Sequence, residues 1–100
     1  MILTFGNGRS LAVSSVSEKK SVYRLPQVWE LTIQSNEDMT SDELDGLLTP
    51  ENIASIEYYN GMETKTLTGY DTVDFVSKTV TETEVSLTIK LLKKIDANNE

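Results

Sequence analysis

The chain has 100 residues, of which 38% are hydrophobic and 25% are charged, with a net charge of −7 at pH 7. This composition is typical of one soluble globular domain and unlike that of a disordered chain. Because the sequence contains no cysteine and no histidine, it excludes disulfides, thiolate or imidazole metal ligands, cysteine nucleophiles and the Ser-His-Asp triad.

The N-terminal residues predict a β-hairpin. Residues 2–5 and 11–16 are apolar enough for two short strands, and Asn7-Gly8 lies between them. Asn-Gly is the strongest short hairpin signal, because both residues tolerate the positive φ that a type I′ turn requires. The polar run 14–20 that follows is expected to be a loop or a flexible arm.

The next predicted strand covers residues 22–35. Pro26 interrupts its first part, which favours an edge position or a bulge there. From residue 28 onward apolar and polar residues alternate, so Trp29, Leu31 and Ile33 are expected on one buried face.

A short helix is predicted near residues 41–48. Thr40 and Glu43 have the spacing of a capping box, and Leu44, Leu47 and Leu48 form one apolar stripe. Pro50 after a threonine indicates a second single turn over residues 50–52. Two turns of helix are not stable alone, so the leucines must pack against a sheet.

The second half of the chain predicts further strands. They are expected at residues 53–59, 62–67, 70–76 and 85–92, and Asn60-Gly61 supplies the turn of one hairpin. Residues 79–83 have high β-propensity and are expected at the exposed end of a long hairpin. Val73 and Phe75 are expected on one face of their strand. Residues 85–92 show the cleanest alternation and are expected near the middle of a sheet. The last segment, 93–100, loses this periodicity and is predicted to be a flexible C-terminal tail.

The sequence therefore predicts a mainly β fold, α+β by count, in a single domain over residues 1–92. Turn signals recur at short intervals, which favours a small antiparallel sandwich or partly open barrel of six to seven strands with one short helix near 41–48. Because no long helices separate the strands, a parallel doubly wound sheet is excluded.

The charges are unevenly distributed along the chain. Residues 25–64 contain nine acidic residues and no lysine or arginine. A basic footprint is absent, so direct binding to nucleic acid is not expected. No apolar run reaches the ~20 residues of a membrane helix, and no secretory signal is recognisable, so neither membrane insertion nor secretion by a signal peptide is expected.

The densest acidic segment contains five candidate interaction residues: Glu37, Asp38, Asp42, Glu43 and Asp45. Aligned with a calcium-binding loop, it has Ser41 where glycine is needed and Leu47 where the bidentate glutamate belongs. Helix capping and a solvated face explain the carboxylates better, and neither a metal nor a cofactor is expected.

No catalytic residue is predicted. Carboxylate pairs such as Glu82 and Glu84 share only the outer face of a strand, and no other sequence feature indicates a catalytic pocket. Two further candidate interaction residues are Tyr58 and Tyr59, which are adjacent and must point to opposite faces of a strand. We expect one of them in the core and the other at an interface.

The chain resembles small proteins of about 100 residues that are encoded in phages and prophages of Gram-positive hosts, beside tail and baseplate genes. The segments that carry the resemblance are Phe5–Gly8, Leu11–Val13, Leu31–Ile33, Ser41–Asp45, Leu47–Asn52 and Gly69–Tyr70. Several tail proteins use small β-barrel or sandwich modules that assemble into rings, and the resemblance brings no catalytic residues with it.

The resemblance implies a non-enzymatic structural or assembly protein, associated with a tail or baseplate, that acts by protein–protein contact. Its expected partners are further copies in a homo-oligomer or other virion components, and its expected location is the host cytoplasm or the virion. A second hypothesis stays open. The acidic residues could imitate a row of phosphates in a soluble inhibitor that blocks a nucleic-acid-binding site on a host defence enzyme.

Overall fold

The computed structural model describes residues 1–20 and 27–95, which form two antiparallel four-stranded sheets and two short helices. We call the first the small sheet. Its strand order is β2–β1–β5–β6, with the bounds Ser10–Ala12, Ile2–Phe5, Ser55–Tyr59 and Thr64–Thr68. We call the second the long sheet. Its strand order is β3–β4–β8–β7, with the bounds Ser15–Lys20, Gln27–Ser35, Val85–Ile95 and Thr72–Val80.

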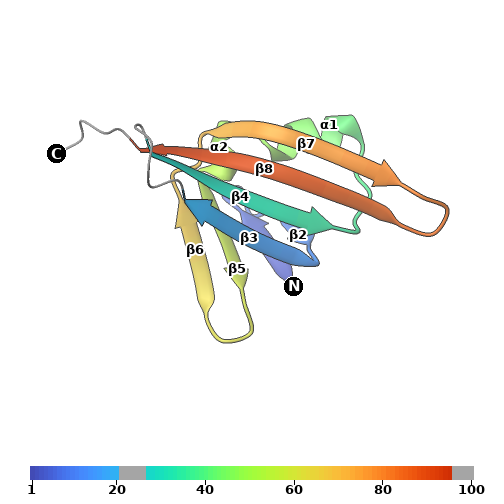
Figure 1. The fold of residues 1–100 in the computed structure, drawn as a ribbon, viewed down its shortest axis with the longest axis horizontal. Coiled ribbons are helices and arrows are strands. Elements are labelled where there is room, and N and C mark those ends of the chain that lie inside the picture. Colours follow the sequence, from blue (N-terminus) through green and yellow to red (C-terminus); the bar gives the residue numbers. More distant parts are fainter. Residues whose placement is uncertain (21–26, 96–100) are drawn as a thin grey trace.

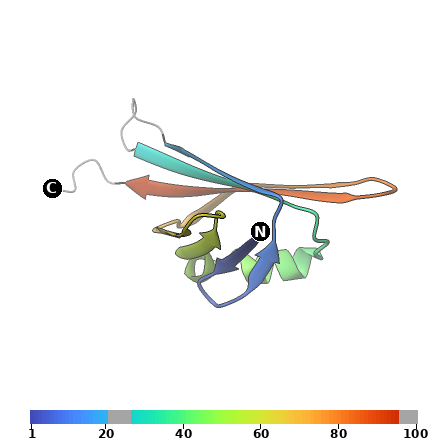
Figure 2. The same cartoon turned by 90° about the horizontal axis from the view of Figure 1, so that it is seen from below.

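The small sheet and both helices lie on the same side of the long sheet (Figures 1 and 2). The β7–β8 hairpin extends beyond this layer at one end of the molecule (Figure 2). The opposite face of the long sheet is not covered by any described element (Figure 2). The molecule is elongated, with extents of 49 × 28 × 24 Å.

The core lies between the two sheets and is built by the alternation expected of strands with one buried face. In the long sheet, Leu31 and Ile33 of β4 are opposite Leu91 and Ile89 of β8, and all four are fully buried. The predicted inward face of residues 28–35 and the central position of β8 are therefore confirmed. The small sheet contributes Leu3, Phe5, Leu11 and Ile56. The two helices contribute Leu47 and Ile53, and the loop before α1 contributes Met39.

The helix signals in the sequence are also confirmed. Helix α1 covers Ser41–Leu47, and both hydrogen bonds of the capping box between Thr40 and Glu43 are present. Helix α2 covers Pro50–Ile53. The buried side chain of Asn52 joins the two helices, because its Nδ2 donates to the carbonyl oxygen of Gly46 at 2.9 Å.

The N-terminal hairpin forms as predicted, but its turn is not of type I′. Gly8 has a φ of +89°, whereas no residue other than glycine has a positive φ in the described chain. The loop is therefore longer, and the Phe5 N–H donates to the carbonyl oxygen of Arg9. The chain also packs closely here, since the Gly6 N–H donates to the Asn52 carbonyl oxygen at 2.8 Å.

The prediction of a loop over residues 14–20 is wrong. Residues 15–20 form β3, which pairs along its whole length with β4. The segment is polar because β3 is an edge strand with little burial, where only Val16 packs against the core. Pairing with an apolar neighbour supplies the stability that its own composition does not indicate.

The C-terminal hairpin differs from the prediction in two ways. A bulge lies between Val73 and Phe75, so Val73 pairs with Leu91 and packs against the core while Phe75 pairs with Lys90 on the outer face. The prediction that these two side chains share one face is therefore wrong. Strand β8 also continues to Ile95, three residues beyond the predicted end of its strand.

The mainly β class and the short helix near 41–48 are confirmed, but the predicted architecture is not. The described residues contain eight strands rather than six to seven, and they form two separate sheets rather than one barrel or sandwich of that size. The Pro26 interruption and the tail beyond residue 95 lie outside the described residues. The single domain over 1–92 stays a prediction.

Candidate interaction surface

The predicted acidic residues lie in the loop after β4 and in α1, but they do not form one site. Glu37 Oε2 accepts a hydrogen bond from the Ala12 N–H at 3.0 Å. Asp38 Oδ1 lies 2.5 Å from Lys78 Nζ, which also donates to the Met39 carbonyl oxygen. Two of the five residues therefore bind other parts of the same chain.

Glu43 has a structural role as well. Its carboxylate accepts the backbone N–H of Thr40, and this hydrogen bond is the main cause that lowers the pKa of Glu43; the Thr40 hydroxyl and nearby Arg9 act in the same direction. Asp42 and Asp45 are exposed, and neither forms an ion pair within the described residues. Within residues 1–20 and 27–95, no group of three or more acidic side chains is placed to hold a metal ion.

The two adjacent tyrosines point to opposite sides of β5. Tyr58 packs partly buried against the core, whereas Tyr59 is 57% exposed on the outer face of the small sheet. Met62, in the turn that follows, is 90% exposed. The side chain of Asn60 holds that turn by accepting the Met62 and Glu63 N–H groups at 2.9 Å. The expected core position of one tyrosine is confirmed, and an interface role for Tyr59 stays a prediction.

The remaining aromatic residues do not join this surface. Tyr70 is buried, and its hydroxyl donates to Glu18 at 3.4 Å. Burial, followed by the charge of Glu18, raises the pKa of Tyr70 well above its ordinary value. Trp29 lies between two lysines, with Lys93 Nζ 3.9 Å and Lys20 Nζ 5.2 Å from the ring centre. These contacts stabilise one end of the long sheet through cation–π attraction.

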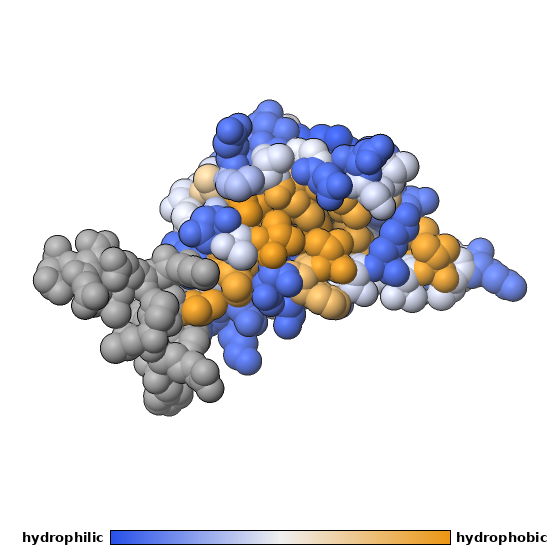
Figure 3. All heavy atoms as spheres, turned by 90° about the horizontal axis from the view of Figure 1, so that it is seen from above, coloured by the Kyte–Doolittle hydropathy of each residue, from blue (hydrophilic) through white to orange (hydrophobic). Residues whose placement is uncertain are grey.

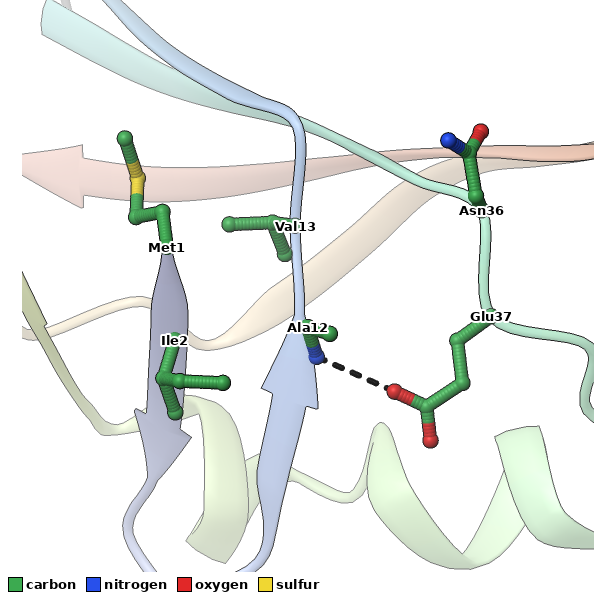
Figure 4. Close-up of a pocket in the computed structure, with 6 residues that line it drawn as sticks. All are labelled: Met1, Ile2, Ala12, Val13, Asn36 and Glu37. Atoms are coloured by element: carbon green, nitrogen blue, oxygen red, sulfur yellow. Dashed lines mark hydrogen bonds between the residues drawn. The ribbon is translucent and has the colours of Figure 1, made fainter.

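A shallow hollow of about 390 Å³ opens beside the N-terminus (Figure 4). Met1, Ile2, Ala12, Val13, Asn36 and Glu37 line it. The only charged side chain among them is that of Glu37, whose carboxylate is already bound to the Ala12 N–H (Figure 4). The hollow therefore presents a mainly apolar surface, and its lining residues do not place a nucleophile beside a base.

Within residues 1–20 and 27–95 each sheet has two strands with a free edge, and these edges differ in how well they are protected against pairing. In β2, the Ala12 carbonyl oxygen accepts from the Ser35 hydroxyl, and the Ala12 N–H donates to Glu37. Side chains thus occupy the backbone groups that another strand would need. Strand β6 has only five residues, three of them threonines. Strand β3 ends in the charged sequence Glu18-Lys19-Lys20.

Strand β7 is the longest of the four edge strands, and it contains a bulge between Val73 and Phe75 and the inward-pointing Lys78. It has nine residues, and its exposed apolar side chains are Phe75 at 50%, Val76 at 39% and Val80 at 63%. Figure 3, seen from the side of β7, shows apolar side chains in the middle of this face, between the polar helix layer and the long sheet. A long, apolar and unpaired edge is the form of surface that pairs with another strand.

The sequence indicated β-rich segments at residues 70–76 and 79–83 but not this surface. Apolar alternation locates a strand, yet it contains no information on which strands end up at an edge.

No protein-family model, curated protein or solved structure matches the chain. Within residues 1–20 and 27–95, no helix has the length and apolar character that a membrane crossing needs.

Proposed function

We propose that this chain is a non-enzymatic, phage-derived structural or assembly protein, associated with a tail or baseplate, that acts by protein–protein contact. The observation that carries the proposal is the β7 edge, where nine residues of strand lie open with three exposed apolar side chains. A soluble protein gains nothing in stability from such an edge and risks aggregation, so a partner that covers it is its simplest explanation.

Two further observations support contact rather than chemistry. The acidic residues that are brought close to other groups serve as caps and tethers within the chain. The exposed Tyr59 and Met62 provide a second apolar surface on a turn that Asn60 holds in place. Aromatic and methionine side chains are enriched in protein interfaces. The assignment to a tail or baseplate rests on the sequence resemblance.

The alternative of an acidic inhibitor gains no comparable support. Of the nine acidic residues in 25–64, Glu37, Asp38 and Glu43 have partners within the chain, which leaves six for an imitation of phosphates. A variant with Asp42→Lys and Asp45→Lys would test this hypothesis directly. Its binding to a defence enzyme would have to fall sharply if the acidic residues carried the interaction.

The proposal is tested by the composition of assembled particles. Particles are purified from a lysate of the host that carries the gene, and the chain is quantified in them by mass spectrometry. We expect a fixed number of copies per particle, and we expect deletion of the gene to stop assembly at a defined intermediate. Normal, infectious particles made without the chain would refute the proposal.

A further inference from the structure

We infer that Asn60-Gly61, in the turn between β5 and β6, is a site of spontaneous chemical modification. The asparagine side chain cyclises onto the peptide nitrogen of the glycine and is then converted to aspartate or isoaspartate by water. Because both reacting groups belong to neighbouring residues, the first step is effectively unimolecular and its rate depends on how the turn holds them. The inference goes beyond the proposed function and does not depend on it.

The reaction has two steps, and neither oxidises or reduces any atom. In the first, the Gly61 nitrogen bonds to Cγ of Asn60 and the Cγ–Nδ2 bond breaks. Nδ2 leaves as ammonia, together with the proton that the Gly61 nitrogen gives up. In the second, water opens the succinimide ring and the Gly61 nitrogen regains a proton. Opening at Cγ gives aspartate, whereas opening at the main-chain carbonyl carbon gives isoaspartate.

The Gly61 nitrogen is available for this attack. Gly61 is exposed, and its N–H donates to no acceptor within residues 1–20 and 27–95, so water can reach it and remove its proton. Glycine has no Cβ to crowd the approach, and nothing lies within 4 Å of the place where one would be. The nucleophile is therefore neither bound nor sterically shielded.

The asparagine amide is held and polarised by the same turn. Its Oδ1 accepts the N–H groups of Met62 and Glu63, each at 2.9 Å, and these two bonds reach across Gly61. When the Gly61 nitrogen attacks Cγ, negative charge develops on Oδ1, and backbone donors aimed at that atom stabilise it as an oxyanion hole does. The folded turn thus orients the amide and favours the charge that forms on it.

The chain contains a second Asn-Gly pair, Asn7-Gly8, which is less well prepared to react. It is also exposed, and Gly8 has a φ of +89°, close to the +97° of the glycine in the β5–β6 turn. However, the Gly8 N–H donates to the Phe5 carbonyl oxygen at 2.9 Å, and this bond must break before the nitrogen can react. Asn7 Oδ1 accepts one N–H, that of Arg9. The structure therefore predicts that the β5–β6 turn reacts first.

The modification changes an exposed surface of the protein. Both products add a negative charge to a chain whose net charge is −7. Isoaspartate also inserts one further carbon into the main chain of the turn, and the length of a turn sets the register of its hairpin. The change lies between Tyr59 and Met62, which are 57% and 90% exposed. Aged chains therefore present a different β5–β6 turn from newly made ones.

The test measures the rate of conversion at both asparagines in the native chain. The protein is incubated at mildly alkaline pH and then digested with an acid protease, so that no further conversion occurs during digestion. Mass spectrometry quantifies the products, because each conversion raises the mass by one unit, and chromatography separates the aspartate and isoaspartate peptides. We expect Asn60 to react roughly two- to tenfold faster than Asn7, the factor that one additional hydrogen bond at Gly8 corresponds to.

The unfolded chain is the control for the role of the structure. In concentrated urea both turns are lost, and because glycine follows each asparagine the two rates should become similar. Asn60 should react no faster there than in the native chain. Asn60→Ser and Asn7→Ser are a matched pair for measurements of the intact mass: the first should remove the fast conversion and the second should leave it. Circular dichroism shows whether each variant has kept its fold.

Four outcomes would overturn the inference. They are conversion of Asn7 as fast as that of Asn60 in the native chain, the same ratio of the two rates in urea as in the native chain, slower conversion of Asn60 in the native chain than in urea, and no isoaspartate at Asn60. The second outcome would show that the flanking residues determine the rate and the turn does not. None of these results depends on assembly, so a failure here leaves the proposed function standing.

Discussion

Ser35→Ala should destabilise the fold more than the removal of one oxygen atom suggests. The Ser35 side chain is 1% exposed, its hydroxyl donates to the Ala12 carbonyl oxygen, and it accepts the Glu37 N–H at 3.0 Å. It therefore connects the edge of the small sheet to the end of β4 in the long sheet. Alanine removes both hydrogen bonds and supplies no replacement for either backbone group.

Each such hydrogen bond contributes about 0.5 to 1.5 kcal/mol net, so the substitution should cost about 1 to 3 kcal/mol. For a domain of this size, about 2 kcal/mol corresponds to a fall of roughly 10 °C in melting temperature. The assay is urea unfolding followed by circular dichroism, at one fixed protein concentration. Ser14→Ala is the matched control, because Ser14 is exposed and its hydroxyl makes a single 3.2 Å bond to the Gln34 carbonyl oxygen. If Ser35→Ala costs no more than Ser14→Ala, the role of Ser35 as a connection between the sheets is wrong.

Two further predictions concern a pair of glycines and a buried tyrosine. Gly6→Ala should cost about 1 to 3 kcal/mol, because the new Cβ would lie 2.8 Å from the Glu51 backbone oxygen, whereas Gly46→Ala has open space in α1 and should stabilise by about 0.5 to 1 kcal/mol. Urea unfolding measures the change in stability for both variants. Changes of the same sign would contradict the close packing at Gly6 and the open space at Gly46. Because burial and Glu18 raise the pKa of Tyr70, the unfolded chain releases the phenol proton first, and stability should fall as the pH rises above the ordinary value of 10.0. Tyr70→Phe should reduce that fall above pH 10, and identical pH slopes there would contradict the assignment.

Local signals in the sequence were reliable where a few neighbouring residues determine the structure. The capping box at Thr40 and Glu43 and the threonine before Pro50 placed both helices. Alternation alone identified β8 and the inward face of β4. In these cases the hydrogen bonds or the buried face depend on residues close together in the chain.

Features that depend on a distant partner were missed. Strand β3 has a polar sequence with one apolar residue facing the core, and it is ordered by pairing with β4. The bulge between Val73 and Phe75 reverses the faces predicted by simple alternation, because one extra residue changes the side to which every later side chain points. Glu37 was expected on an interaction surface, yet it protects the edge of β2 through its bond to Ala12.

The β7 edge shows why the most informative surface of this molecule could not be found in the sequence. The sequence of residues 72–80 would suit a central strand equally well. Only the order β3–β4–β8–β7 makes β7 an edge, and that order follows from contacts between residues far apart in the chain. The edges also differ from one another, because side chains occupy the backbone of β2, while β7 leaves Val76 and Val80 exposed beside backbone groups that no described residue pairs with. A chain that protects one edge so specifically and leaves its longest apolar edge open is better explained by a partner strand than by chance exposure.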